Sequence, residues 1–107
     1  MKSNEFMLVW STCPDRPTAD LLARHLVEQR LAACVTVLPA AASTYRWRAA
    51  VETADEFVLM IKTRQALWVE VEAAVQALHP YEVPELIAVP LAAGSGPYLD
   101  WLEESTE

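Results

Sequence analysis

The pattern of apolar and polar positions from Leu31 to Lys62 predicts one long β-hairpin. Residues 34–48 have the side chains of a strand almost throughout, with successive residues facing opposite sides near the end. The return run Phe57–Ile61 is apolar on both faces, which is typical of a central strand. We therefore expect the turn near residues 49–50.

The length of this hairpin predicts that its far end extends beyond the domain. Fifteen extended residues span roughly 50 Å at about 3.3 Å each, whereas a compact domain of this size is only about 35 Å across. Tyr45 and Trp47 would then lie on an exposed strand pair that can pair with another chain. In the alternative, Pro39 divides the first arm into two ordinary strands joined by a bend.

The chain before the hairpin predicts a strand and a helix. Phe6–Trp10 is nearly all apolar and is expected to be a central strand. A turn over Ser11–Asp15 leads into a helix that runs to about Gln29. Asp15 is the expected N-cap of this helix, and Pro17 suits its first turn.

The chain after the hairpin predicts two helices and a strand. Thr63 is the expected cap of a helix that ends at residues 79–80, because proline excludes the helical conformation from the residue before it. Leu86–Val89 has the pattern of a short strand. A terminal helix is expected to pack on the core through residues at helical spacing, which are Tyr98, Trp101 and Leu102.

The predicted order is β-α-β-β-α-β-α, over a single domain of residues 1–107. This order predicts the α+β class and a ferredoxin-like βαββαβ sandwich with a long hairpin between strands two and three and an added C-terminal helix. Helices would cover one face of a four-stranded antiparallel sheet. Since no element remains for the other face, we expect subunits to pack against it.

Composition adds weight to this expectation of subunit packing. Hydrophobic residues make up 53% of the chain and charged residues only 21%, a surplus that predicts apolar surface buried between subunits. The net charge of −7 argues against a nucleic-acid partner, whose phosphates demand basic patches.

The first residues predict neither a signal peptide nor a membrane span. Residues 1–5 are largely polar, and the apolar run that follows is far too short for either. We expect a cytoplasmic protein without membrane insertion. In that compartment Cys13 and Cys34 are expected to be free thiols, because they form no C-x-x-C pattern.

The densest group of candidate functional side chains is the segment His79–Glu85. It holds an imidazole, a phenol and two carboxylates, and two prolines stiffen it. Imidazole and carboxylate groups are ligands of divalent metals, so the segment is a candidate metal site. The alternative is a rigid connector from helix to strand with a capping histidine.

Other polar residues give weaker signals. Lys62 and Arg64 are expected to form salt bridges with Glu82 or Glu85. Cys13 stands near a predicted helix start, where the helix dipole would lower the pKa of a thiol. A lone cysteine without a placed base does not make an enzyme, and no known catalytic motif is present, so we expect no enzymatic activity.

Five segments of the chain together resemble the CutA divalent-cation tolerance family. They match in order and spacing over about residues 8–102, and the His-Pro-Tyr-Glu-Val-Pro-Glu segment is the most diagnostic. The segments are Arg30–Val35, Ser43–Trp47, Met60–Thr63, His79–Glu85 and Tyr98–Leu102.

The resemblance implies a ferredoxin-like homotrimer with interlocking hairpins and a role in tolerance to divalent metals such as copper, without a known catalytic reaction. His79 matches the motif's histidine and would bind Cu²⁺ or another divalent cation, together with a carboxylate such as Glu82. No organic cofactor is implied. By analogy with the family, an inter-subunit cleft would be lined by Trp47, Lys62, Tyr81 and Glu85.

The chain departs from the family pattern at three places. Some members have a cysteine where Ser11 stands and a second histidine where Leu78 stands. The glycine that usually follows the tryptophan of the Tyr-x-Trp segment is replaced by residues 48–50, Arg-Ala-Ala. The first two changes leave His79 as the one residue of that set of candidate metal ligands.

Two other functions fit the same architecture. One is a trimeric small-molecule-binding or signalling protein that resembles PII-type proteins, with its ligand in the cleft between subunits. The other is a structural trimer that scaffolds other, so far unknown, proteins.

Overall fold

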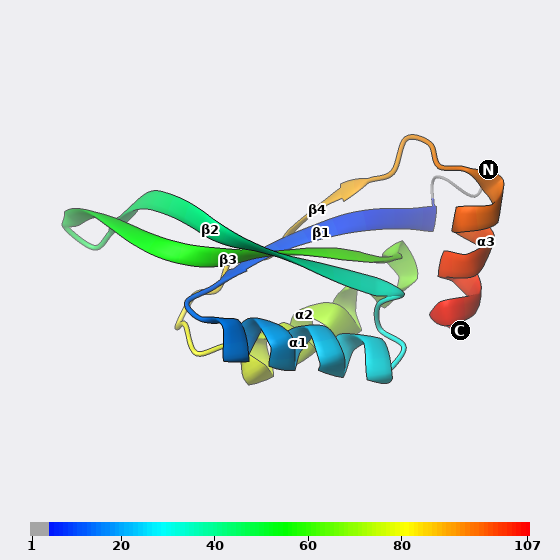
Figure 1. Ribbon diagram of the computed structural model, residues 1–107, viewed down its shortest axis with the longest axis horizontal. Helices are drawn as coiled ribbons and strands as arrows, with labels where there is room; N and C mark the ends of the chain where they lie inside the picture. The colour runs from blue at the N-terminus through cyan, green and yellow to red at the C-terminus, as the bar shows by residue number, and fades with distance from the viewer. Residues whose placement is uncertain (1–4) are drawn as a thin grey trace.

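The computed structural model describes residues 5–107, so the polar residues 1–4 lie outside the described part (Figure 1). A short 3₁₀ helix, Gln65–Leu67, precedes the second helix. The elements are β1 (Phe6–Cys13), α1 (Arg16–Glu28), β2 (Cys34–Trp47), β3 (Ala50–Arg64), α2 (Trp68–Leu78), β4 (Ile87–Pro90) and α3 (Gly96–Ser105).

The strands form one antiparallel sheet in the order β2-β3-β1-β4. This order and the sequence of elements are those of the split βαβ, ferredoxin-like plan. The predicted fold class, including the long hairpin and the added terminal helix, is confirmed. No helix within residues 5–107 is long and apolar enough to span a membrane.

Helices α1 and α2 lie against one face of the sheet and form the main core with it (Figure 1). Alternate residues of the central strands turn toward these helices, as the two-residue period of a strand requires. The core includes Met7, Val9, Leu59 and Ile61 from the sheet, Leu22 and Leu26 from α1, and Val71 and Val75 from α2. The opposite face of the sheet carries neither α1 nor α2.

The β2–β3 hairpin projects beyond the rest of the domain, as its length predicts (Figure 1). The molecule is 45 Å long but only 26 Å and 24 Å in the other two directions. Strand pairing continues to Trp47 opposite Ala50, so the turn consists of residues 48 and 49. Arg48 has a positive φ of 57°, at a turn position that favours glycine.

Pro39 forms a bulge and does not break the strand. The register of β2 against β3 shifts between Leu38 and Ala41, where one extra residue is accommodated and Ala40 has a φ of 64°. A bulge bends a strand and re-aims its side chains without ending the pairing. The expected alternative of two separate strands is therefore wrong, and β2 remains one element.

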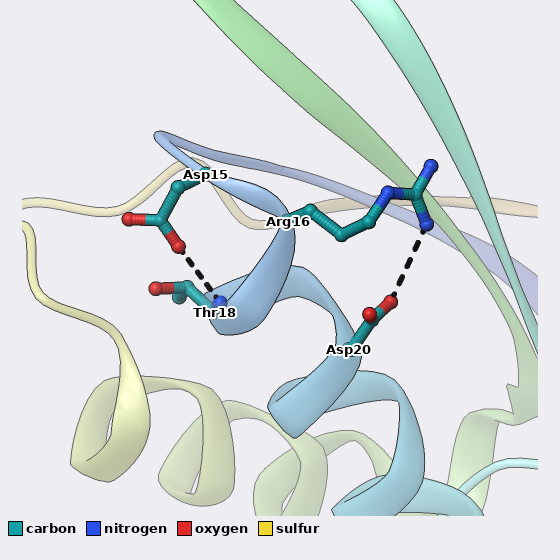
Figure 2. Close-up of polar contacts among 4 residues, drawn as sticks. All are labelled: Asp15, Arg16, Thr18 and Asp20. Carbon is teal, nitrogen blue, oxygen red and sulfur yellow. Dashed lines mark hydrogen bonds and ion pairs between the residues drawn. The ribbon is translucent and has the colours of Figure 1, made fainter.

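Strand β1 is longer than the sequence predicts, since the expected turn at Ser11–Asp15 begins only after Cys13. Its last residues remain paired with β3, up to Cys13 opposite Phe57. Asp15 then caps α1 as predicted, because its side chain accepts a hydrogen bond of 2.8 Å from the Thr18 backbone N–H (Figure 2). Arg16 and Asp20 form an exposed ion pair one turn apart at 3.6 Å (Figure 2).

Thr63 does not cap α2, contrary to the prediction. It lies inside β3, fully buried, and its hydroxyl donates a hydrogen bond of 2.6 Å to the Leu31 carbonyl. The 3₁₀ helix separates β3 from α2, and the N-cap residue of α2, Leu67, makes no side-chain cap bond. The strand continues through Thr63 because its pairing with β1 outweighs the local capping preference.

Helix α3 packs on the core through Leu102, as predicted, but with Leu99 in place of Tyr98 and Trp101. Leu99 and Leu102 are buried against Phe6 and Ala33. Tyr98 and Trp101, expected in the core, are 41% and 44% exposed, and their ring centroids lie 5.5 Å apart. A Cβ at Gly94 would lie 2.9 Å from Leu99 Cδ2, so the missing side chain makes room for Leu99 on the inner face.

We predict that Asp15→Ala lowers the urea midpoint of unfolding at pH 7, because it leaves the Thr18 N–H without its acceptor. Asp15→Asn should retain most of the stability, since asparagine caps helices comparably well. The backbone hydrogen bond from Thr18 lowers the pKa of Asp15, so the contribution exists above about pH 4 and is lost as pH falls through the folded pKa. Equal midpoints for wild type and Asp15→Ala at pH 7 would contradict this role.

Candidate functional site

The loop after α2 and the hairpin arm enclose two adjoining cavities, which we call the tip cleft. The first has a volume of about 350 Å³ and the second about 430 Å³. Both are lined by Tyr45, Tyr81 and Val83, so they are parts of one groove. The first cavity also includes Trp47, Glu52, Pro80 and Glu82, and the second includes Thr12, Glu56 and Glu85.

His79 ends α2 and fastens the following loop to the end of β1. His79 is 7% exposed, and its Nε2 lies 2.6 Å from the Thr12 carbonyl oxygen. Nδ1 lies 3.1 Å from the backbone nitrogen of Tyr81. Since a carbonyl only accepts and an amide N–H only donates, the proton is on Nε2 and both ring nitrogens are engaged.

Cys13 lies beside His79 but is not an activated thiol. Its Sγ is 3.8 Å from His79 Nε2, and it is buried at the end of β1 rather than at the start of α1. Burial, followed by the charges of Asp15 and Glu56, raises the pKa of the thiol to about 12. The prediction of a lowered pKa is therefore wrong, because desolvation disfavours the thiolate more than the helix dipole favours it.

Tyr81 and Glu56 form the buried polar contact of the cleft. The Tyr81 hydroxyl donates a hydrogen bond of 2.7 Å to Glu56 Oε2, and Glu56 is only 6% exposed. Burial, followed by the hydrogen bond and charge of Glu56, raises the pKa of Tyr81. Sequence reasoning missed Glu56, whose one signal was a carboxylate directly before the apolar run of β3.

The two glutamates of the loop are held differently. Glu82 is exposed and pairs with Arg48 of the hairpin turn at 3.4 Å. Glu85 accepts a hydrogen bond of 2.7 Å on its backbone carbonyl from Ser11 Oγ. Ser11, which replaces the cysteine of some family members, is thus fully buried and helps to fasten the loop.

The predicted salt bridges of Lys62 and Arg64 to this loop are wrong. Lys62 Nζ instead donates to Thr36 Oγ1 at 2.6 Å, on the face of the sheet away from α1 and α2. Arg64 Nε donates to Thr106 Oγ1 at 2.8 Å, next to α3. Both side chains lie at the end of β3 that is far from the hairpin turn, so neither reaches residues 82–85.

Three of the four residues predicted for an inter-subunit cleft come together within one chain. Trp47 and Tyr81 line the first cavity, and Tyr81 and Glu85 line the second. Lys62 lies apart from them, beside Cys34 and Thr36 on β2. A cleft that joins all four between subunits stays a prediction.

The described residues do not form a built metal centre. No group of three or more His, Cys, Asp or Glu side chains within residues 5–107 is placed to hold a metal ion. His79 would have to give up the Thr12 carbonyl or the Tyr81 amide to bind one, and Glu82 would have to leave Arg48. The geometry of one chain therefore does not fit a copper site at His79 and Glu82.

We predict that Tyr81→Phe lowers the free energy of unfolding by about 1–3 kcal/mol, because the buried Glu56 carboxylate loses its donor. Tyr45→Phe is the matched control, since Tyr45 lines the same cleft but is 40% exposed; its effect should stay within about 0.5 kcal/mol. Urea titration measures both. Equal losses would mean that the contact with Glu56 contributes no stability.

The same variants give a second readout at high pH. Because the folded pKa of Tyr81 is raised, its proton is held more tightly in the folded chain than in the unfolded one. The contribution of the protonated Tyr81 hydroxyl to the free energy of unfolding is complete below the unfolded pKa of about 10 and declines as pH rises above it. The difference in free energy of unfolding between wild type and Tyr81→Phe should therefore become smaller above about pH 10.

This chain is similar to a known protein family and to known proteins over nearly its whole length. The model of a family described as CutA1 divalent ion tolerance protein matches residues 7–105. The "Divalent-cation tolerance protein CutA" of Thermus thermophilus is 44% identical over 99 residues, 92% of this chain and 96% of that protein. Human "Protein CutA" is 44% identical over 96 residues, 90% of this chain, which spans about half (54%) of that relative.

The fold of this chain is also similar to that of solved structures. CutA from Xylella fastidiosa has a TM-score of 0.94 at 46% identity, with 96% of this chain and 99% of that chain covered. CutA1 from Oryza sativa has a TM-score of 0.95 at 37% identity, with 100% and 98% covered.

Proposed function

Because the chain belongs to the CutA1 divalent ion tolerance family, we propose that it acts in divalent-cation tolerance as a homotrimer without a catalytic reaction of its own. The observation that carries this proposal is the uncovered apolar face of its sheet. The role in cation tolerance is supported by the names of relatives. The assembly is supported by the apolar surface that this chain leaves exposed.

The face of the sheet away from α1 and α2 is covered by α3 at Phe6, and beyond that residue it is largely apolar across three strands. Its side chains alternate along each strand with those that face the core. Trp10 of β1 pairs with Met60 of β3 and with Ile87 of β4. Ile87 and Val89 are 57% and 48% exposed. The apolar members are Leu8, Trp10, Val58, Met60, Ile87 and Val89. A contiguous apolar face of this kind is typical of a subunit interface.

The two edges of the sheet support a ring of subunits. Strand β2 forms one edge and β4 the other, and neither has a strand beyond it within residues 5–107. An exposed edge favours pairing with another chain. Since the two edges are different surfaces, their contact is heterologous and builds a closed ring when the rotation allows it. The number of subunits in the proposal, three, is what the family resemblance implies.

The absence of a catalytic reaction is supported by the groups next to the cleft. The Cys13 thiol is buried and has a raised pKa of about 12, so it is protonated at neutral pH. His79 uses both ring nitrogens for backbone hydrogen bonds and is not available to it as a base. An activated nucleophile needs the opposite arrangement.

The proposed location is the cytoplasm. Cys13 and Cys34 are free thiols, which suits a reducing compartment. The relative from Arabidopsis thaliana is named as a chloroplast protein, so localisation differs among relatives in this proposal.

A second candidate function is small-molecule binding of the PII-like kind. The tip cleft favours it, because its two cavities have the size of small-ligand sites and are lined by aromatic and polar groups.

We predict that light scattering of the purified protein gives a mass near three times the 11.9 kDa of one chain. Ile87→Lys places a charge on the open face and should shift the mass to that of one chain. Val69→Lys is the matched control, since Val69 is 71% exposed on α2, and it should leave the trimer intact. A wild-type monomer at micromolar concentration would refute the assembly.

Copper binding through His79 and Glu82 stays a prediction of the resemblance and is tested by calorimetry. If it occurs, Cu²⁺ should give measurable heat with wild type and much less with His79→Ala or Glu82→Gln. His25→Ala, which removes the chain's other histidine, is the control and should bind as wild type does. Negligible heats for all four proteins would remove the metal role. Circular dichroism checks the fold of each variant.

A further inference from the structure

Cys34 and Lys62 lie side by side at the base of the hairpin. They are partners in register on β2 and β3, and Lys62 Nζ lies 3.8 Å from Cys34 Sγ. Thr36, two residues along β2 on the same face, accepts a hydrogen bond of 2.6 Å from Lys62 Nζ. The pairing of the two strands therefore holds a thiol and an amine of one chain in contact.

The ammonium group of Lys62 is not paired with an acid. The ion pairs within residues 5–107 are formed by Arg16, Arg24 and Arg48. Lys62 is half-buried, and its side chain donates to Thr36 and Cys34. Its positive charge can thus pair with a thiolate, which is the form of cysteine that reacts with peroxide.

The pair lies at the end of the sheet next to α3 and not on the arm. Lys62 is two residues from Arg64, which is opposite Phe6 of β1, and Phe6 packs against α3. Burial, followed by the charge of Cys34, raises the pKa of Tyr98 in α3, so Cys34 lies within electrostatic reach of this helix. Because both groups belong to one chain, a bond between them needs neither an open cleft nor a neighbouring subunit.

The other cysteine provides an internal comparison. Cys13 is fully buried, and burial, followed by nearby negative charges, raises the pKa of its thiol to about 12. Its side-chain neighbour is the imidazole of His79. Lys62 is the only lysine of residues 5–107, and it lies at Cys34. An oxidant should therefore modify Cys34 and spare Cys13.

We propose that Cys34 and Lys62 form a peroxide-responsive switch, in which oxidation joins the sulfur to the lysine nitrogen as a sulfenamide. The Cys34 thiolate attacks hydrogen peroxide, so that an S–O bond forms, the O–O bond breaks and hydroxide leaves. The hydroxide takes one proton from the Lys62 ammonium. The free amine then attacks the sulfenic sulfur, so that the S–N bond forms, the S–O bond breaks and water leaves. Sulfur loses the two electrons that peroxide gains, and two water molecules are released.

The bond ties β2 to β3 where the hairpin begins. The flexible stem of lysine lets the nitrogen close the remaining distance to the sulfur. The cross-link encloses residues 34–62, which contain the whole arm, and it restricts the unfolded chain as a disulfide does. A thiol reductant reopens it by displacing the amine from sulfur, and a second thiol releases Cys34. This switch goes beyond cation tolerance and requires no metal.

The test is mass spectrometry of the full chain after treatment with hydrogen peroxide in metal-free buffer. We expect linked chains that are lighter than the reduced chain by two hydrogen atoms, with the peptides of Cys34 and Lys62 joined and no tryptic cleavage after Lys62. Alkylation after unfolding should label Cys13 and not Cys34, which distinguishes the link from a disulfide between the two cysteines. An unmodified Cys34, a disulfide, or oxidation without a link to Lys62 would overturn the proposal.

Variants assign the link to the lysine amine. Lys62→Arg keeps a cation that donates to Thr36, but a guanidinium stays protonated and does not attack sulfur. It should lower the yield of linked chains on the order of tenfold or more and leave Cys34 as a sulfenic or sulfinic acid. Lys2→Arg removes the chain's other lysine and should link as wild type does. Equal yields from Lys62→Arg and wild type would show that Lys62 is not the partner.

Urea unfolding gives an independent readout. Peroxide should raise the unfolding midpoint of wild type, because the cross-link restricts the unfolded chain, and dithiothreitol should return it to the starting value. Lys62→Arg should show no such rise, and a rise of equal size in that variant would count against the link. These results involve neither copper heats nor the scattering mass, so the switch and the proposed function can fail separately.

Discussion

The pairing of β3 with two strands of unequal length is the constraint on which the rest of the structure depends. On one side β1 pairs with β3 only as far as Cys13 opposite Phe57, whereas on the other side β2 continues to Trp47 opposite Ala50. Beyond Phe57, β3 therefore has a partner on one side and no core beneath it. The arm is the direct result of this difference in length, and so is the free space beside it.

The tip cleft occupies that free space. Where β1 ends, its last carbonyl groups are available, and His79 bonds to that of Thr12 while Ser11 holds the Glu85 carbonyl. These two bonds place the loop against the arm, so that Tyr81 reaches Glu56. The bulge at Pro39 lies opposite this part of β3, because Ala41 is the partner of Glu56. A loop, a strand end and a bulge thus meet at one buried carboxylate.

The residues that identify the family are largely structural in this chain. His79, Tyr81 and the backbone of Glu85 are each occupied by hydrogen bonds within the fold. Such bonds fix a loop whether or not a ligand is present. A motif that resembles a set of metal ligands can therefore be kept for the geometry that it imposes. The buried negative charge of Glu56, outside that motif, is the less expected feature of the site.

The sequence by itself determined the order of the elements, the hairpin with its turn to within one residue, the cap at Asp15 and the open face of the sheet. Each follows from local periodicity, capping chemistry or simple length, which act between near neighbours in the chain. Only the tertiary structure decided the position of Thr63 inside β3, the buried stripe of α3 and the raised pKa of Cys13. It also decided the contact of Tyr81 with Glu56. These two residues are 25 positions apart and meet only because β1 ends before the hairpin does and the loop folds against the arm.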